Sequence, residues 1–162
     1  MPRILGAFVK KIKNPFNKMG FGRKLIYSRK SNKKSEPLVQ FFSPDKNGSG
    51  QIEIVHGNGP VASLSYQLGK NLPVRLSEIR SKDYYVDSGR MNALRVGEAY
   101  KRQGFASQMV AELTSQAKKN RANVYLRVNV ANVGAVEFYK ASGFKVVRSL
   151  GGSEQLMAYY NV

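Results

Sequence analysis

The chain has 162 residues, of which 42% are hydrophobic, and a formal net charge of +17. This is enough for one hydrophobic core, and the absence of cysteine excludes disulfides, a thiolate nucleophile and cysteine–metal sites. No apolar run approaches the ~20 residues that a membrane-spanning helix needs, and the first residues lack a secretory apolar core. We therefore expect one domain with a basic arm, in a reducing compartment such as the cytoplasm.

The first 34 residues are the most basic part of the chain. They contain eleven lysines and arginines and no acid, because the first acidic residue is Glu36. Apolar residues share one helical face before Pro15 interrupts the pattern: Ile4, Leu5, Phe8, Val9 and Ile12. We predict that residues 1–35 form a basic amphipathic N-terminal arm and that residues 36–162 form the folded domain.

The arm has four interpretations. Basic residues interleaved with aromatic ones are typical of segments that bind RNA or a nucleoprotein surface, which is the partner that we favour. A basic amphipathic helix also suits an anionic membrane surface, with Phe8 and Phe16 inserted. The lack of acids is a property of organellar transit peptides as well. The simplest alternative is a solvated arm that packs on its own domain.

Between the arm and Val96 the sequence is rich in strand-forming residues. We predict strands at 38–42, 51–56, 61–68, 74–79 and 84–96. Turn-forming residues make up the segment from Ser43 to Gly50, which we predict as a loop.

A helix start that contains Gly104 follows the strand ending near Val96. Apolar residues then recur at helical spacing, at Phe105, Met109, Val110, Leu113 and Ala117, with Glu112, Gln116, Lys118 and Lys119 on the other side. This pattern predicts one amphipathic helix of about four turns that ends near Asn120. The alternation at 124–128 predicts the next strand, and two strands joined by a helical crossover are expected to be parallel.

Residues 128–144 predict a second, shorter helix. Asn132 is a suitable N-cap, Ala135, Phe138 and Tyr139 lie along the helix, and Gly143 ends it. The last two strands, at 144–150 and 153–162, are joined by Gly151 and Gly152 in a hairpin. The order of elements predicts an α+β domain with a mixed sheet.

The segments 96–106 and 128–144, in this order and spacing, resemble the acetyl-CoA-binding core of the GNAT superfamily of N-acetyltransferases. The family pattern in the first segment is Gln or Arg, two variable residues, Gly, one variable residue, then Gly or Ala. Lys101, Gly104 and Ala106 occupy these places, and Lys101 departs from the pattern by keeping the charge without arginine's planar fork. The resemblance implies a mixed, mainly antiparallel sheet with a central parallel pair that splays apart, and flanking helices.

The resemblance also implies the cofactor site. The N–H groups of the helix start, from Gln103 to Ser107, would face the pyrophosphate of acetyl-CoA, because a helix N-terminus carries about half a positive charge. A side chain at Gly104 would hold the phosphate away, and the pantetheine arm would lie between the splayed strands. The predicted cofactor-binding residues are Leu94, Arg95, Val96, Lys101, Arg102, Gln103, Gly104, Phe105, Ala106, Ser107, Asn132, Ala135 and Phe138.

For catalysis, the resemblance implies that a backbone N–H between Leu94 and Val96 polarises the thioester carbonyl and that Tyr139 is the general acid. The alternative for Tyr139 is a core position with its hydroxyl satisfied. A general base does not stand out. The nearest candidates in the sequence are His56, Glu78, Asp87 and Glu98, none of them persuasive, and a water relay or inefficient catalysis remains open.

We therefore expect an N-acetyltransferase whose acceptor amine is nucleic-acid-associated, either a protein amine or aminoacyl-tRNA, because a basic protein attracts anionic partners. The resembling enzymes usually have one or two helices between their first two strands, which wall the acceptor groove, but the loop at Ser43 to Gly50 is too short for them. The alternative is a weakly catalytic or non-catalytic structural protein, anchored by its arm in a nucleoprotein, virion or membrane-surface assembly.

Overall fold

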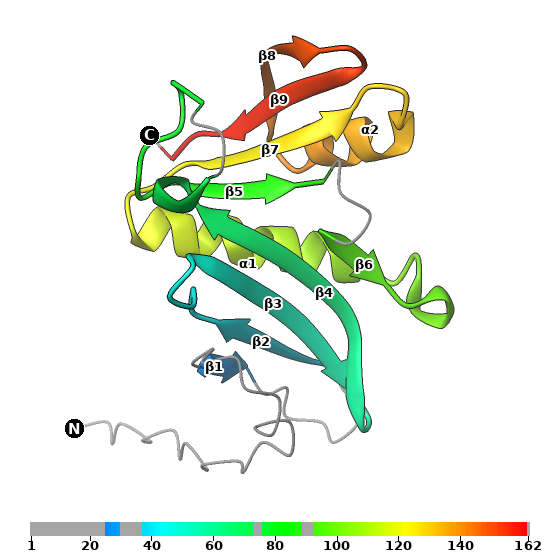
Figure 1. The fold of residues 1–162 in the computed structure, drawn as a ribbon. Helices are drawn as coiled ribbons and strands as arrows, with labels where there is room; N and C mark the ends of the chain where they lie inside the picture. Colours follow the sequence, from blue (N-terminus) through cyan, green and yellow to red (C-terminus); the bar gives the residue numbers. More distant parts are fainter. Residues whose placement is uncertain (1–24, 30–36, 73–75, 89–92, 162) are drawn as a thin grey trace, which may run out of the picture.

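The computed structural model describes residues 25–29, 37–72, 76–88 and 93–161 (Figure 1), so most of the predicted arm lies outside the described residues. The strands are β1 (Leu25–Arg29), β2 (Leu38–Phe42), β3 (Ser49–His56), β4 (Gly59–Leu68), β5 (Tyr84–Asp87), β6 (Leu94–Val96), β7 (Val124–Asn129), β8 (Lys145–Gly151) and β9 (Glu154–Tyr159). The helices are α1 (Phe105–Lys119) and α2 (Val133–Ala141), with the short 3-10 turns η1 (Gly69–Asn71) and η2 (Glu98–Tyr100). In the part of the chain that the structure describes, no helix is long and apolar enough to cross a membrane.

One mixed sheet organises the domain. Its strand order is β1-β2-β3-β4-β5-β7-β9-β8, and β6 pairs with β4 outside this path. β5 and β7 are parallel, whereas the other pairs of strands are antiparallel. The predicted α+β fold, with a mainly antiparallel sheet and a central parallel pair, is therefore confirmed.

The main core lies between the sheet and the helices, and α1 lies behind the sheet in Figure 1. The buried side of α1 contains the five apolar residues that the periodicity predicts, which pack with Ile54, Leu64 and Leu126 of the sheet. Gln116, predicted on the polar side, is also buried, and its Nε2 donates to Glu112 at 3.2 Å. The reason is geometric, because Gln116 lies seven residues after Met109 and thus on the same helix face.

A smaller apolar cluster lies on the opposite face of the sheet and contains Tyr85, Tyr125, Leu156 and Ala158. The connection between β4 and β5 covers it with Leu72, Leu76 and Ile79. The predicted strand at 74–79 is therefore wrong in its described part, since 76–79 form a turn in which the Ile79 N–H donates to the Leu76 carbonyl at 3.0 Å. Leu76 and Ile79, which favoured a strand, instead pack partly buried against the smaller cluster.

The predicted strand at 84–96 is two strands with different partners. β5 pairs with β7 and briefly with β4, whereas β6 pairs with β4. Tyr85 pairs with Gln67, and Leu94 pairs with Leu64. Two positions that are nine residues apart in β5 and β6 therefore pair with positions only three residues apart in β4. β5 and β6 therefore pair with β4 at different places, and only β5 belongs to the parallel pair.

The N-terminal edge of the sheet differs from the prediction at one strand. Residues 25–29, which the sequence analysis places in the arm, form β1 beside β2. Between β2 and β3 the chain forms a turn without a helix, as predicted. Asp45 closes this turn, because its Oδ1 accepts from the N–H groups of Asn47 and Ser49 at 2.8 and 3.0 Å.

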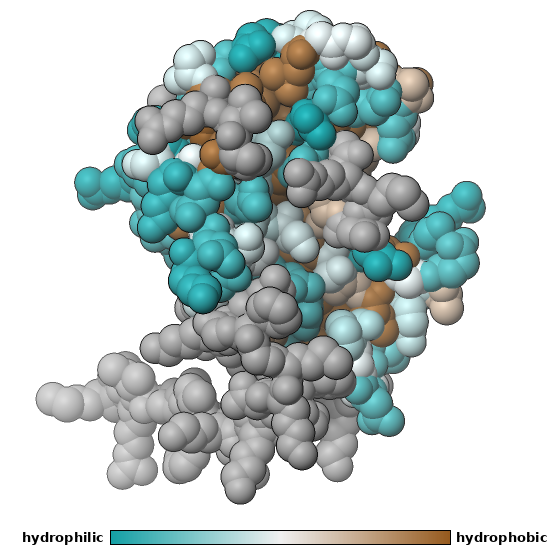
Figure 2. All heavy atoms as spheres, viewed as in Figure 1, coloured by the Kyte–Doolittle hydropathy of each residue, from teal (hydrophilic) through white to brown (hydrophobic). Residues whose placement is uncertain are grey.

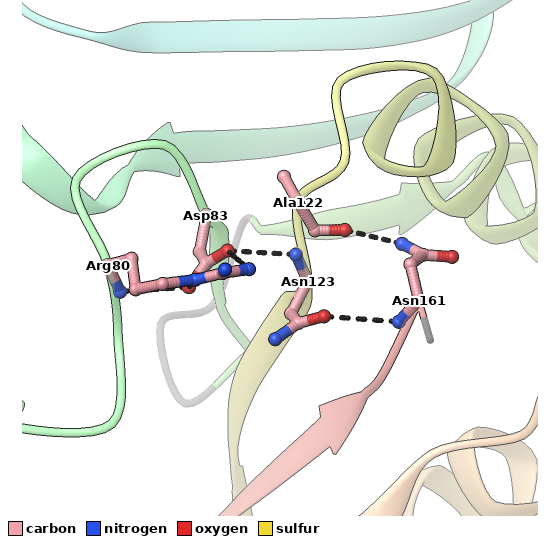
Figure 3. A network of polar contacts seen from close by, with 5 residues as sticks. All are labelled: Arg80, Asp83, Ala122, Asn123 and Asn161. Carbon is pink, nitrogen blue, oxygen red and sulfur yellow. Dashed lines mark hydrogen bonds and ion pairs between the residues drawn. The ribbon is translucent and has the colours of Figure 1, made fainter.

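A buried carboxylate holds together the start of the parallel pair (Figure 3). The Asp83 side chain is 0% exposed and accepts hydrogen bonds from the backbone and guanidinium of Arg80 and from the Asn123 N–H. Asn161 donates to Asn123 Oδ1 and to the Ala122 carbonyl, which ties the end of the chain to the same point. This network sets where β5, β7 and β9 lie relative to one another.

Asp83→Asn is expected to destabilise the protein by about 2–3 kcal/mol at neutral pH, because an NH2 group replaces one of the two buried oxygens at which donors are aimed, and the negative charge is lost. Burial alone raises the pKa of Asp83, but the hydrogen bonds from Arg80 and Asn123 outweigh burial and leave this pKa below its usual value. Stability from this group is therefore complete above the unfolded-state pKa, about 3.9, and is lost as pH falls through the lower folded-state pKa. Urea unfolding between pH 6 and pH 3 should show the difference between variant and wild type shrinking.

Glu137→Gln is the matched control. Glu137 forms an exposed ion pair with Lys140 at 3.0 Å, which contributes little to stability. A difference between Asp83→Asn and wild type that stays constant across this pH range would contradict the assigned role of Asp83.

Candidate active site

The parallel pair opens after Asp87. This residue pairs with Arg127, which is the last pair between β5 and β7. β7 continues to Asn129 alongside β9, whereas β6 runs beside β4 and apart from β7 (Figure 1). The predicted splay of the central strands is thus present, and it lies between β6 and the end of β7.

Hydrogen-bond alternation decides which backbone groups of β6 face this gap. Gly97 N–H donates to the Val61 carbonyl at 2.8 Å, and Ser65 N–H donates to the Ala93 carbonyl at 2.7 Å. Because antiparallel ladders alternate, Arg95 also bonds to β4, and the backbone groups of the two residues beside it, Leu94 and Val96, point away from β4. Of the three predicted residues of β6, only these two present N–H and C=O groups to the gap.

The connection from β6 to α1 is held by aromatic rings at both ends. Tyr100 of η2 stacks on Phe105, the first residue of α1, with ring centroids 6.1 Å apart. His56 packs edge-on against Tyr100 at 5.9 Å. Gln103 Nε2 also donates to the Ala99 carbonyl at 3.2 Å. The short exposed segment between the two rings is therefore held in place between β6 and α1.

The backbone of this segment has the alternating handedness of an anion-binding concavity. Arg102 has φ +62° and Gly104 has φ +81°, whereas Gln103 between them has a negative φ. Such alternation turns successive N–H groups to the same side. Within the described ranges, no backbone carbonyl accepts from the N–H groups of Phe105, Ala106 or Ser107. The start of α1 is a set of free donors aimed outward, as the sequence predicts.

Charged side chains surround these donors. Hydrophilic residues gather at the right edge of Figure 2, over the β6–α1 connection. Lys101 and Arg102 are both exposed, and Lys101 Nζ lies 2.6 Å from Glu98 Oε2. An exposed pair of this kind is weak, so Lys101 can exchange Glu98 for another anion at little cost.

α2 directly follows β7 and contacts it. Asn132 caps the helix, since its Oδ1 accepts from the Ala135 N–H at 3.1 Å, as the sequence predicts. Ala135 and Phe138 are partly buried against the main core. The Asn132 side chain therefore shapes the turn between β7 and α2.

Tyr139 is the buried polar side chain of α2. It is 4% exposed and lies between Phe138 and Phe144, with ring centroids 5.1 and 5.7 Å away. Burial raises the pKa of its phenol, and a hydrogen bond with Ser88 partly offsets this effect. Tyr139 therefore carries its proton at neutral pH. The sequence analysis did not single out Ser88.

The candidate bases all have partners. Asp87 bonds to Arg127 Nε at 3.1 Å, and Glu98 pairs with Lys101. Glu78 pairs with Arg148, whose hydrogen bond lowers the Glu78 pKa. His56 contacts the ring of Tyr100. These contacts favour none of the four as the base.

The model of the acetyltransferase (GNAT) family matches residues 40–144, which is more than half of the chain. The chain belongs to the GNAT acetyltransferase family. The GNAT match includes the free donors of α1 and extends through Tyr139 to Phe144. No curated protein sequence matches the chain significantly.

Solved structures share the GNAT fold. An acetyltransferase from Thermus thermophilus matches with a TM-score of 0.55 and 19% identity over 70% of this chain and 65% of that one. Arabidopsis thaliana NAA60 in complex with acetyl-CoA matches with a TM-score of 0.54 and 20% identity, over 70% of this chain and 76% of that one. The ribosomal-protein-S18-alanine N-acetyltransferase from Escherichia coli matches with a TM-score of 0.50 and 16% identity, over 68% of each chain. The chain thus spans less than two thirds of the Thermus protein, and these identities show the fold alone.

Proposed function

We propose that the protein is an N-acetyltransferase that moves an acetyl group from acetyl-CoA to an amine. The observation that carries this proposal is that two groups directly follow two strands that diverge. Free N–H donors begin α1, which follows β6, and the protonated phenol of Tyr139 belongs to α2, which follows β7. The family to which the chain belongs and the acetyl-CoA in the Arabidopsis structure support this reading.

The residues present fit acetyl-CoA. A pyrophosphate needs several convergent N–H donors, which the start of α1 supplies between Gly104 and Ser107. The position where a Cβ of Gly104 would lie has nothing within 4 Å, so the protein leaves room for a ligand there. An extended arm with amide groups can pair with the strand edge at Leu94 and Val96, as an added strand would. Asn132, Ala135 and Phe138 would line the opposite wall.

In this proposal each group has one task. An N–H of Leu94 or Val96 donates to the thioester carbonyl as negative charge develops on its oxygen. Tyr139 gives its proton to the departing sulfur. Lys101 and Arg102 attract the phosphates, and the turn capped by Asn132 holds α2 and Tyr139 in place.

We further propose that the acceptor amine is nucleic-acid-associated, either a protein amine or aminoacyl-tRNA. The net charge of +17, with eleven basic residues in the first 34, attracts polyanions. The Escherichia coli structure of the same fold is named for acetylation of a ribosomal protein. The sequence analysis expects the family's helices between the strands predicted at 38–42 and 51–56, which are β2 and β3, and there the chain has only the turn at Asp45. A bulky acceptor therefore meets no helical wall there.

A second function is favoured by one observation, the ion pairs that occupy the candidate acids Glu78, Asp87 and Glu98. Without a base, the fold would serve as a binding module that carries acetyl-CoA and is anchored by its basic arm in a nucleoprotein, virion or membrane-surface assembly.

An acceptor panel tests the proposal. Each transfer releases coenzyme A, and a thiol reagent detects it without background because the chain has no cysteine. We expect release with aminoacyl-tRNA or a ribosomal-protein peptide, and little with spermine, because a cationic protein repels a polycation. Preference for spermine would contradict the acceptor class. Binding of acetyl-CoA without release on any acceptor would favour the second function.

A variant that lacks residues 1–24 isolates the arm and keeps β1 in the sheet. It should bind acetyl-CoA as the full chain does, because the donors of α1 are untouched. Its rate on RNA-linked acceptors should fall and depend less on salt, because fewer phosphate contacts remain. An unchanged salt dependence would show that the arm does not bind the acceptor.

A further inference from the structure

Exposed cations gather around one end of the sheet, where β5 and β7 begin. They come from η1, from the segment before β5 and from the end of α1, and they are Lys70, Arg80, Lys82, Lys118, Lys119 and Arg121. Hydrophilic residues also lie along the left edge of Figure 2, beside the C-terminus marked in Figure 1. We call these six residues the basic end of the domain.

Hydrogen bonds hold the three segments of the basic end together. The Lys70 N–H donates to the Ser81 carbonyl at 3.1 Å, which joins η1 to the segment before β5. Asp83 accepts from Arg80 and from the Asn123 N–H, which joins that segment to the chain directly after α1 (Figure 3). The fold therefore fixes these cations on one surface.

The charge of the basic end is largely uncompensated. Asp83 is the one acid within residues 69–71, 79–83 and 116–123, and it is buried and bonded to Arg80. Among the described residues, no carboxylate forms an ion pair with the side chains of four other cations, Lys70, Lys82, Lys118 and Arg121. These four charges are available to an anionic partner.

Arg121 lies at a position that favours glycine. The end of α1 is closed by two bonds, from the Ala122 N–H to the Ala117 carbonyl at 2.9 Å and from the Arg121 N–H to the Lys118 carbonyl at 3.0 Å. The residue at this position has a φ of +50°, which glycine adopts without strain and a side chain does not. The other non-glycine residue with positive φ in the described ranges is Arg102, beside the free donors of α1. A strained arginine at the basic end favours a role for its charge.

An exposed aromatic ring lies at the same end of the sheet. Tyr160 is 46% exposed, and its ring packs edge-on against Tyr125, with centroids 6.2 Å apart. The next residue, Asn161, donates its N–H to Asn123 Oδ1 at 3.1 Å, beside the end of α1. The other large hydrophobic side chains exposed among the described residues are three valines, in β8 and around the start of α2. Tyr160 is therefore a single exposed ring beside the cations.

We propose that the basic end binds a single-stranded nucleic acid, with its cations on the phosphates and Tyr160 stacked on a base. Cations spread over a surface suit a backbone of repeated phosphates, and an exposed ring among them suits unpaired bases. An anionic membrane fits less well, because insertion needs a face of several apolar side chains.

This surface is separate from the candidate acetyl-CoA site. The free N–H donors lie at the start of α1 and the basic end lies at its other end, about 22 Å away for a helix of 15 residues. Binding of a nucleic acid here therefore requires neither acetyl-CoA nor acetyl transfer.

The double variant Lys82→Gln with Arg121→Gly, in the full chain, is the first test. Glycine suits position 121, so the variant should unfold in urea no earlier than wild type. Lys118 and Lys119 are kept, because cations in the last turn stabilise a helix. With a labelled oligouridylate of about 20 nucleotides, we expect affinity to fall about 10-fold at physiological salt. The slope of log K against log salt should fall by about 1.4, since each phosphate contact on a single strand contributes about 0.7.

Lys140→Gln with Lys145→Gln is the matched control. It removes the same two charges from α2 and β8, where both side chains are exposed. Its affinity for the oligouridylate should stay within twofold of wild type. An equal loss in the two double variants would overturn the proposal, because net charge alone would then explain the binding.

Tyr160 is tested by its own signal. The chain has no tryptophan, so Tyr160→Trp introduces a single indole, whose emission should be quenched when a base stacks on it. Tyr160→Leu should weaken binding of the oligouridylate about 10-fold, whereas Tyr160→Phe keeps the ring and should bind as wild type does. Unchanged emission of Tyr160→Trp at saturating oligouridylate would overturn the proposed contact.

Other probes separate the sources of the phosphate. Single-stranded DNA should bind by the same surface, and duplex RNA should bind more weakly, because its bases are not free to stack. Vesicles of anionic lipid that bind more tightly than the oligouridylate would overturn the proposal. Each variant should bind acetyl-CoA with wild-type affinity, and a parallel loss of acetyl-CoA binding would overturn the assignment of a separate surface.

Discussion

Replacing Tyr139 by phenylalanine is expected to lower turnover about 100-fold or more while the affinity for acetyl-CoA stays nearly unchanged. The ring fills the same space between Phe138 and Phe144, so packing is kept, and only the proton for the departing sulfur is lost. Steady-state kinetics with the best acceptor of the panel, together with calorimetric titration of acetyl-CoA, measures both quantities.

The pH dependence of turnover adds a second readout for Tyr139. Because burial raises the pKa of this phenol, wild type keeps its acid through neutral pH and loses activity only as pH rises past that pKa. Tyr139→Phe has no such proton to lose, so this alkaline limb should be absent from its profile.

Tyr84→Phe is the matched control for Tyr139→Phe. Tyr84 is also buried, and its hydroxyl accepts a hydrogen bond from Asn120 Nδ2 at 2.6 Å, but it lies at the start of β5. This variant should lose some stability and keep its turnover. Full turnover in Tyr139→Phe would remove Tyr139 from the mechanism and leave it as a core residue.

The helices could be predicted because local signals agree there. The 3.6-residue spacing of apolar residues in α1, the left-handed Gly104 before it and the Asn132 cap of α2 all act within a few residues of the chain. The polarity of Gln116 predicted an exposed side chain, but this residue lies seven positions after Met109, on the same buried face of the helix.

The strands were predicted less well because strand-forming residues do not identify a partner. Residues 76–79 are apolar enough for a strand, yet they cover the face that contains Tyr85 and Tyr125. The division of 84–96 into two strands had a local signal, the turn-forming run Asp87-Ser88-Gly89. The length of the segment does not show that β5 and β6 have different pairing partners.

The candidate site was predictable in outline. The glycine-containing helix start and Tyr139 could be assigned from the sequence, because their spacing to neighbouring elements is fixed by the chain. The backbone groups of β6 could not, because the register with β4 decides that Leu94 and Val96 face the gap. The hydrogen bond from Ser88 to the Arg127 carbonyl could not either, since the two residues lie 39 positions apart in the sequence.

Gly104→Glu is expected to weaken acetyl-CoA binding at least 100-fold, to the point where calorimetric titration at moderate salt shows no heat. A carboxylate at this position competes with the pyrophosphate for the N–H donors of α1 and repels it. The protein itself offers no obstacle to the new side chain, because nothing lies within 4 Å of the Cβ position. The substitution should therefore lower the affinity for acetyl-CoA more than it lowers the stability of the fold.

Two variants separate charge from backbone strain. Gly104→Ala carries the cost of a left-handed conformation, about 1–2 kcal/mol, without a charge. Gly152→Glu has the same charge, a positive φ of +58° and open space around its Cβ, but lies in the turn between β8 and β9. If the donors of α1 hold the pyrophosphate, Gly152→Glu binds normally and Gly104→Ala binds more tightly than Gly104→Glu. Wild-type affinity in Gly104→Glu would place the phosphate site elsewhere, because a carboxylate among those donors must weaken the binding of a pyrophosphate there.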